Sequence, residues 1–222
     1  MSGDMGAGHV QALNLVCGGL LLSAVLILWR REMAAIVRLL CVQGTLVAGL
    51  AAVLAADHRS PQLWAVAVGL LILKGVLLPL VMGRAVRSAT RVREAEPLVN
   101  VPASLVAAAL LTLLAYAASR PLTTLSPTPA TGAIPVGLAM VFLGYFTLTT
   151  RRNALPQVAG FLVLENGTGV VALLATAGVP LIVELGAALD LLLLVLVLQV
   201  LTARLRATFG GTDLDELREL RD

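Results

Sequence analysis

The sequence has little charge, few aromatic residues and almost no cysteine or histidine. Only 13% of its 222 residues are charged, against roughly 25% in a soluble domain. His9 and His58 both fall at the predicted outside surface, so no pair of histidines is placed to ligate an intramembrane haem. Cys17 and Cys41 form no CxxC site and are interpreted as small packing residues.

The motifs of common enzyme classes are also absent. The chain has no glycine-rich phosphate loop, no zinc motif and no nucleophile elbow. We therefore expect no catalytic centre, no metal site and no cofactor in this chain. Aromatic residues make up 4% of it, and Leu, Ala, Val and Gly dominate, as in close-packed transmembrane helices.

Long apolar runs define the class of protein. Hydrophobic residues make up 59% of the chain, and a membrane-spanning helix needs roughly 20 of them in succession. The runs lack the alternation of barrel strands. We predict an all-α, polytopic transmembrane bundle of about seven spans, at 10–29, 33–56, 62–83, 98–118, 134–150, 154–177 and 181–203.

Arginines predict the orientation of these spans. They follow alternate runs, at Arg30 and Arg31, at Arg84, Arg87, Arg91 and Arg93, at Arg151 and Arg152, and at Arg204 and Arg206. The opposite ends carry only Arg59 and Arg120. By the positive-inside rule the N-terminus lies outside and the C-terminus in the cytoplasm. The net charge of +3 thus reflects topology, and we expect no nucleic-acid partner.

The chain divides at a loop rich in Pro, Thr and Ser. We expect a four-span region at 1–118, an extended and mobile extracytoplasmic loop at 119–133, and a three-span region at 134–206. In the tail at 207–222, Leu214, Leu217 and Leu220 recur every third residue and predict a short amphipathic helix. That helix lies on a partner subunit or the membrane surface, or else the tail is solvated and frayed.

Four ionisable residues stand inside the apolar runs: Lys74, Glu165, Glu184 and Asp190. A charge at mid-bilayer costs roughly 2.5–3.5 kcal/mol on insertion scales, so such residues are paired or used. Glu165 lies about 16–17 Å into its span. Asp190 is also near mid-membrane, whereas Glu184 lies near the outer rim. We interpret the carboxyls as members of a proton path, with structural hydrogen bonds to neighbouring helices as the alternative.

Small residues accompany both deep carboxyls. Thr168, Gly169 and Ala172 share the helical face of Glu165, and Gly186 and Ala187 precede Asp190. Such residues allow another helix or a water chain to come close.

Lys74, the only lysine of the chain, lies near the middle of the third span. Pro79 follows it and cannot donate a hydrogen bond to the Gly75 carbonyl, which predicts a kink beside the lysine. A broken turn of this kind admits water or a polar partner, although the kink alone also serves packing. The sequence leaves open whether Lys74 pairs with Glu165 or with Asp190.

Residues 151–175, RRNALPQVAGFLVLENGTGVVALLA, precede PLIVELGAALDLLLLVLVLQV and the tail motif DLDELREL. This region resembles hydrogenase-4 component E of group 4 membrane-bound hydrogenases, of the formate hydrogenlyase type. Its last three spans are similar to the K subunit of complex I and the C subunit of cation/proton antiporters. The resemblance implies a subunit without redox centres among antiporter-like membrane partners. It matches Glu165 to the first family carboxylate, and either Asp190 or Glu184 to the second.

These observations together predict a membrane subunit that contributes buried carboxylates to proton or cation translocation in the cell membrane. Two alternatives remain at this point. One is a scaffold that fills the space between pumping subunits, and the other is a stand-alone ion transporter.

Overall fold

The computed structural model describes residues 6–88, 99–125, 127–151 and 154–175, and within these ranges the regular structure is helical, without β-strands. The helices are α1 (Ala7–Trp29), α2 (Met33–His58), α3 (Pro61–Leu70), the π-helical segment η1 (Leu71–Leu77), α4 (Leu78–Ser88), α5 (Val101–Leu125), α6 (Pro129–Gly132), α7 (Ile134–Thr150) and α8 (Ala154–Ala175). Six helices in these ranges, with α3, η1 and α4 counted as one and α6 counted with α7, are long and apolar enough to cross a membrane.

The first six predicted spans correspond to these six helices, and that at 134–150 matches α7 to the residue. The N-cap of α3 forms as its sequence indicates, because the Ser60 hydroxyl accepts a hydrogen bond from the Leu63 amide and Pro61 occupies the first turn. The predicted seventh span at 181–203 and the amphipathic tail lie outside the described residues.

The extended loop predicted at 119–133 is wrong for most of its length. Helix α5 continues through Pro121 to Leu125, and α6 follows after a short break. A proline removes a single helical hydrogen bond. Next to it, the hydroxyls of Thr123 and Thr124 donate to the Arg120 carbonyl, so these polar side chains find partners on the helix itself. The threonines that indicate a loop here are accommodated in a helix.

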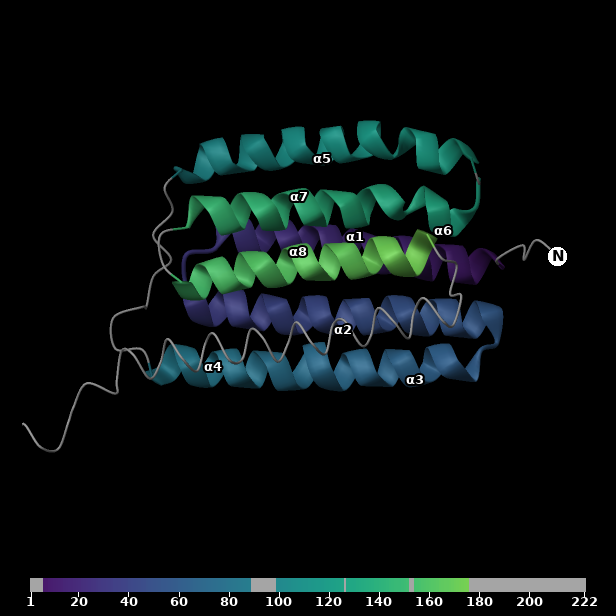
Figure 1. Ribbon diagram of the computed structural model, residues 1–222, viewed down its shortest axis with the longest axis horizontal. Coiled ribbons are helices and arrows are strands. Elements are labelled where there is room, and N and C mark those ends of the chain that lie inside the picture. The colour runs from purple at the N-terminus through teal and green to yellow at the C-terminus, as the bar shows by residue number, and fades with distance from the viewer. Residues whose placement is uncertain (1–5, 89–98, 126, 152–153, 176–222) are drawn as a thin grey trace, which may run out of the picture.

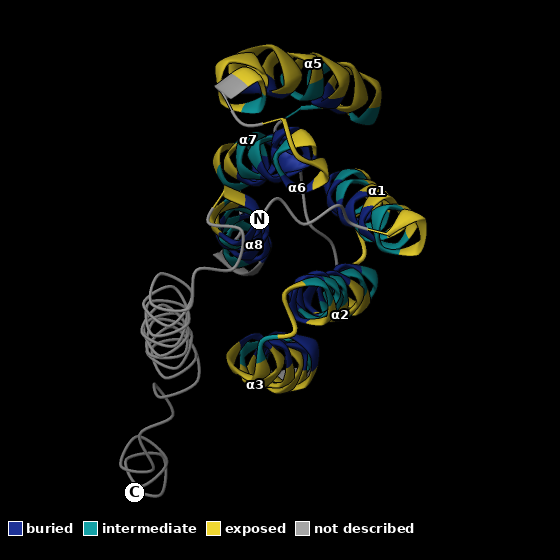
Figure 2. Ribbon diagram, turned by 90° about the vertical axis from the view of Figure 1, so that its right-hand side faces the viewer, coloured by how far each residue is buried: buried dark blue, intermediate teal, exposed yellow. Residues whose placement is uncertain are grey.

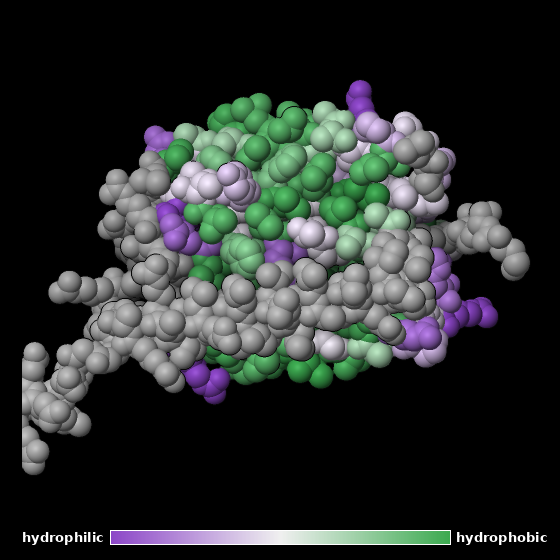
Figure 3. All heavy atoms as spheres, in the orientation of Figure 1, coloured by the Kyte–Doolittle hydropathy of each residue, from purple (hydrophilic) through white to green (hydrophobic). Residues whose placement is uncertain are grey.

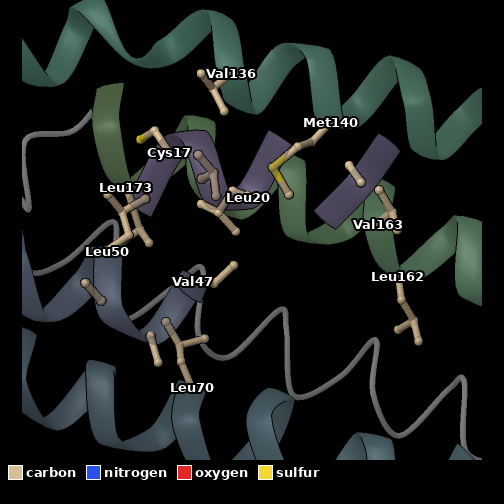
Figure 4. Packing of buried hydrophobic residues seen from close by; sticks show 14 of the residues in the cluster. Cys17, Leu20, Val47, Leu50, Leu70, Val136, Met140, Leu162, Val163 and Leu173 are labelled. Atoms are coloured by element: carbon tan, nitrogen blue, oxygen red, sulfur yellow. The ribbon is translucent and has the colours of Figure 1, made fainter. Parts of the chain in front are cut away.

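The helices run side by side along the long axis of the molecule (Figure 1). Seen end-on, α5 packs outside α7, while α8 and α1 lie on either side between α7 and α2, and α3 lies beyond α2 (Figure 2). The core between them is aliphatic, with Cys17, Leu20, Leu50, Met140 and Leu173 among its members (Figure 4). Cys17 is buried there as predicted.

The outer surface of the bundle is also apolar. Large hydrophobic side chains such as Leu15, Val106 and Leu113 are exposed on α1 and α5. Apolar residues cover much of the middle of the visible face, whereas most of the visible hydrophilic ones lie toward the ends (Figure 3). An exposed apolar belt of this extent is expected of a protein surrounded by lipid.

Helices α7 and α8 form the closest pair in the bundle. Gly137 and Gly144 on α7, and Gly160 and Gly167 on α8, sit where an added Cβ would collide with the opposite helix. At Gly160 and at Gly167 that atom would fall 2.6 Å from the backbone nitrogens of Leu148 and Val141 respectively. Within each helix the two glycines are seven residues apart, about two turns, so they share one face.

Arg151 joins two helix ends. It follows α7 and is almost completely buried, and its guanidinium donates hydrogen bonds of 2.6 and 3.4 Å to the carbonyls of Leu28 and Arg30 at the end of α1. Burial lowers the pKa of Arg151, and the nearby positive charge of Arg31 lowers it further. The arginine therefore caps carbonyls that α1 leaves without a helical partner.

Candidate functional site

An ion pair lies inside the bundle between two helices that are distant in sequence. Lys74 Nζ lies 2.5 Å from Glu165 Oε1. The two residues are only 5% and 7% exposed. Glu165 is eleven residues into α8, which has 22 residues, about 16–17 Å along its axis, so the pair lies near the middle of that helix. The structure thus pairs Lys74 with Glu165, while Asp190, the other partner that the sequence allows, lies outside the described residues.

The lysine stands on an irregular turn. Segment η1 is π-helical over seven residues, and the amide of Leu78 donates to the Leu73 carbonyl, five residues back. Pro79 lies two residues after this segment, so the helix is irregular beside the lysine, where the sequence predicts a kink. Single π-helical turns occur frequently at functional sites.

A polar partner meets the carbonyl that Pro79 cannot bond. The Cys41 thiol on α2 donates a hydrogen bond of 2.9 Å to the Gly75 carbonyl. Cys41 is half-buried, so its interpretation as a packing residue is incomplete. Pro79 has no N–H to donate to the Gly75 carbonyl, and the Cys41 thiol of α2 supplies a donor in its place.

Gly44 allows α2 to come this close. A Cβ there would collide with the carbonyl of Lys74 and would lie 2.9 Å from the amide nitrogen of Gly75. Gly44 and Thr45 lie three and four residues after Cys41, so the three residues belong to the face of α2 that meets η1. The backbone of Lys74 is therefore held against α2, while its side chain extends to α8.

A hydrogen bond between two amide side chains joins α2 to α8. Asn166 Nδ2 donates a hydrogen bond of 3.0 Å to Gln43 Oε1, and both side chains are buried. Asn166 follows Glu165 in the chain, and Gln43 precedes Gly44. The ion pair and the amide pair therefore lie beside each other where α8, α2 and η1 meet.

The predicted site residues are only partly placed. Lys74 and Glu165 come together, whereas Asp190 and Glu184 lie outside the described residues. The close approach expected along the Thr168, Gly169 and Ala172 face is not found among the described residues, since no described atom lies within 4 Å of a Cβ at Gly169. Among the described residues, the close approach to α8 is on the face of Gly160 and Gly167.

Sequence reasoning missed Gln43, Gly44 and the hydrogen-bonding role of Cys41. The position of Gln43 near the middle of an apolar span was a signal that could have been used. An uncharged amide without a partner is also costly to bury there. In the described part of the chain, no group of three or more His, Cys, Asp and Glu residues is arranged to hold a metal ion.

This arrangement permits a simple proton exchange. An ammonium and a carboxylate at hydrogen-bond distance exist as a charged pair, or, after one proton moves, as a neutral amine and a carboxylic acid. A proton can thus pass directly from Lys74 to Glu165 and back, and both groups are neutral after the first transfer. The fold and the site together define a multi-pass helical membrane protein with an ion pair buried in its bundle.

Comparison with known proteins identifies the family. The chain is 48% identical over 210 residues to Uncharacterized protein Rv0085 of Mycobacterium tuberculosis, covering 94% of this chain and 96% of that protein. It is 30% identical over 150 residues to Hydrogenase-4 component E of Escherichia coli and of Shigella flexneri, covering 68% of this chain and 69% of those proteins. The chain belongs to the hydrogenase-4 component E family. No family model and no solved structure matches it.

Proposed function

We propose that this chain is a redox-inactive membrane subunit of a hydrogenase-4-like or complex-I-like assembly, and that it helps to translocate protons or other cations. The observation that carries the proposal is the ion pair of Lys74 and Glu165 at mid-membrane depth. A structural role alone does not require charges there, since replacing a buried ion pair by apolar residues is often neutral or stabilising.

In this proposal Lys74 and Glu165 exchange a proton, and their shared site is the central station of the path. Asp190 and Glu184 are proposed as further stations, the first near mid-membrane and the second near the outer rim. Movement of a partner subunit changes which form of the pair is favoured, because a group that can be neutral or charged responds to nearby charge. Antiporter-like membrane subunits are the proposed partners.

The proposed location is the cytoplasmic membrane, with the N-terminus outside. Arg151 supports this orientation, because its hydrogen bond to the end of α1 places the ends of α1 and α7 at the same end of the bundle. Arginines follow both helices there. The positive-inside rule then assigns that end to the cytoplasm. Cysteine labelling from either side of the membrane tests the assignment.

Ion translocation in vesicles that contain the whole complex tests the function. Glu165→Gln and Asp190→Asn each remove a proton-carrying group with almost no change in shape. We expect both variants to assemble and to translocate fewer ions per turnover of the complex. Ser23→Ala is a matched control, because Ser23 is buried and bonds only the Leu20 carbonyl of its own helix. Normal translocation in both carboxyl variants would contradict the proposal.

A scaffold between pumping subunits is the second candidate, and the glycine-packed pair of α7 and α8 favours it. A scaffold requires shape and tolerates neutral carboxyls, so Glu165→Gln would be silent while Gly144→Leu would prevent assembly. A stand-alone transporter is separated from both by reconstitution of the purified chain, since only a transporter would move ions without partners.

A further inference from the structure

The amide pair of Gln43 and Asn166 is a buried polar cluster that the proposed function does not use. Gln43 is 0% exposed and Asn166 is 4% exposed. One hydrogen bond of 3.0 Å joins them, from Asn166 Nδ2 to Gln43 Oε1. Each primary amide carries two N–H donors and one carbonyl acceptor, so a single bond leaves much of their capacity unused.

Two atoms of this cluster have no hydrogen-bond partner in the described part of the chain: Gln43 Nε2, a donor, and Asn166 Oδ1, an acceptor. Exchanging the nitrogen and oxygen of both amides does not satisfy them. The bond then runs from Gln43 to Asn166 and leaves the other oxygen and nitrogen without partners. Buried amide groups are almost always bonded, and hydrocarbon offers no substitute partner.

We propose that a water molecule occupies this position between α2 and α8. It accepts a hydrogen bond from Gln43 Nε2 and donates one to Asn166 Oδ1. One molecule with a donor and an acceptor side satisfies both orphaned atoms at once. It retains a second O–H and a second lone pair, so a further water or polar group can join it.

The proposed water also has a place in proton transfer. This second inference rests on the proposed function. Asn166 is the chain neighbour of Glu165, and Gln43 is the neighbour of Gly44, against which the Lys74 carbonyl packs. The bound water therefore lies on the α2 side of the ion pair at nearly the same depth. We infer that it is a further station of the proposed proton path, which accepts a proton from the ion pair and releases another through its second O–H to a further water.

Solid-state NMR of the full-length chain in lipid vesicles tests the water directly. Polarisation transfer from water protons to the side-chain nitrogens of Gln43 and Asn166 should be several times faster than to the backbone amide of Leu20. Leu20 is the matched control, because it is 0% exposed like Gln43 and lies at a similar depth in the bundle. Leu20 is nine residues before the end of α1, and Gln43 is ten residues after the start of α2. Transfer as slow as at Leu20 would overturn the proposal. Gln43→Leu and Asn166→Leu assign the signals.

Translocation in vesicles tests the second inference. The double variant Gln43→Leu/Asn166→Leu removes both amides and leaves no orphaned atom, so we expect assembly with a several-fold loss of translocation. Gln43→Glu keeps a hydrogen-bonding group of similar shape and should retain it. A double variant that translocates normally, while Glu165→Gln does not, overturns only the extension of the path. If Glu165→Gln and Asp190→Asn are also silent, the proposed function fails and the NMR result alone decides the water site.

Discussion

Helix α8 presents two contrasting interfaces. Toward α7 it offers glycines and backbone, and the two helices touch with no side chain between them at Gly160 and Gly167. Toward α2 and η1 it offers Glu165 and Asn166, which meet a lysine and a glutamine. Close backbone packing has a single good geometry, whereas an ion pair and an amide pair have alternative protonation and hydrogen-bonding states. The contrast indicates a fixed half and an adaptable half around one helix.

Breaking the ion pair is expected to have the largest effect. Lys74→Met leaves the Glu165 carboxyl buried without its cation, and losing one partner of a buried pair costs about 3–5 kcal/mol. Equilibrium unfolding in mixed detergent micelles measures the free energy. The double variant Lys74→Met/Glu165→Met removes both charges and should recover most of the loss. A double variant as unstable as the single one would show that the contact of Lys74 with Glu165 is not what stabilises this interface.

The glycine interface should respond more strongly to a single methyl group than any lipid-facing site. In Gly144→Ala the new Cβ collides with the backbone nitrogen of Leu164, and overpacking of this kind costs about 1–3 kcal/mol. Gly69→Ala is the matched control, because Gly69 is an exposed helical glycine with no atom of the described residues within 4 Å of a Cβ. There alanine should add up to about 1 kcal/mol through helix propensity. Equal effects at the two positions would contradict the close packing of α7 on α8.

The hydrogen bond at the broken turn should contribute less. Cys41→Ala removes the thiol that donates to the Gly75 carbonyl and should lower the free energy of unfolding by about 0.5–1.5 kcal/mol. Cys41→Ser keeps a donor at the same position and should restore most of it. If serine and alanine behave alike in the same unfolding assay, the thiol is a packing group, as the sequence alone indicates.

Sequence patterns could predict the elements because hydrophobicity and turn chemistry are local properties. The position of α7 and the Ser60 cap of α3 were predicted from residues adjacent in the chain. The depth of Lys74 and Glu165 was equally visible. Their contact was not, because the partner of a buried charge depends on how helices pack, and 91 residues separate the two.

Two features show where local patterns mislead. Residues at 119–125 have loop composition but form the end of α5, where threonine hydroxyls bond carbonyls of the same helix. Gly160 and Gly167 make the close approach to α7, although nothing in the sequence distinguishes them from Gly169, which no described residue approaches. A glycine permits close packing wherever it occurs, and only the arrangement of neighbouring helices decides which glycine is used.

The smallest effect is expected for the energetic coupling between Pro79 and Cys41. Pro79→Ala supplies an amide N–H that can bond the Gly75 carbonyl within its own helix, and it thereby competes with the Cys41 thiol. Cys41→Ala should then cost less in the Pro79→Ala background than in the parent chain. We expect a coupling energy of about 0.5–1 kcal/mol from a double-mutant cycle of unfolding free energies. Strict additivity would mean that Pro79 is not the reason why α2 donates a hydrogen bond to this turn, and the π-helix beside Lys74 would need another cause.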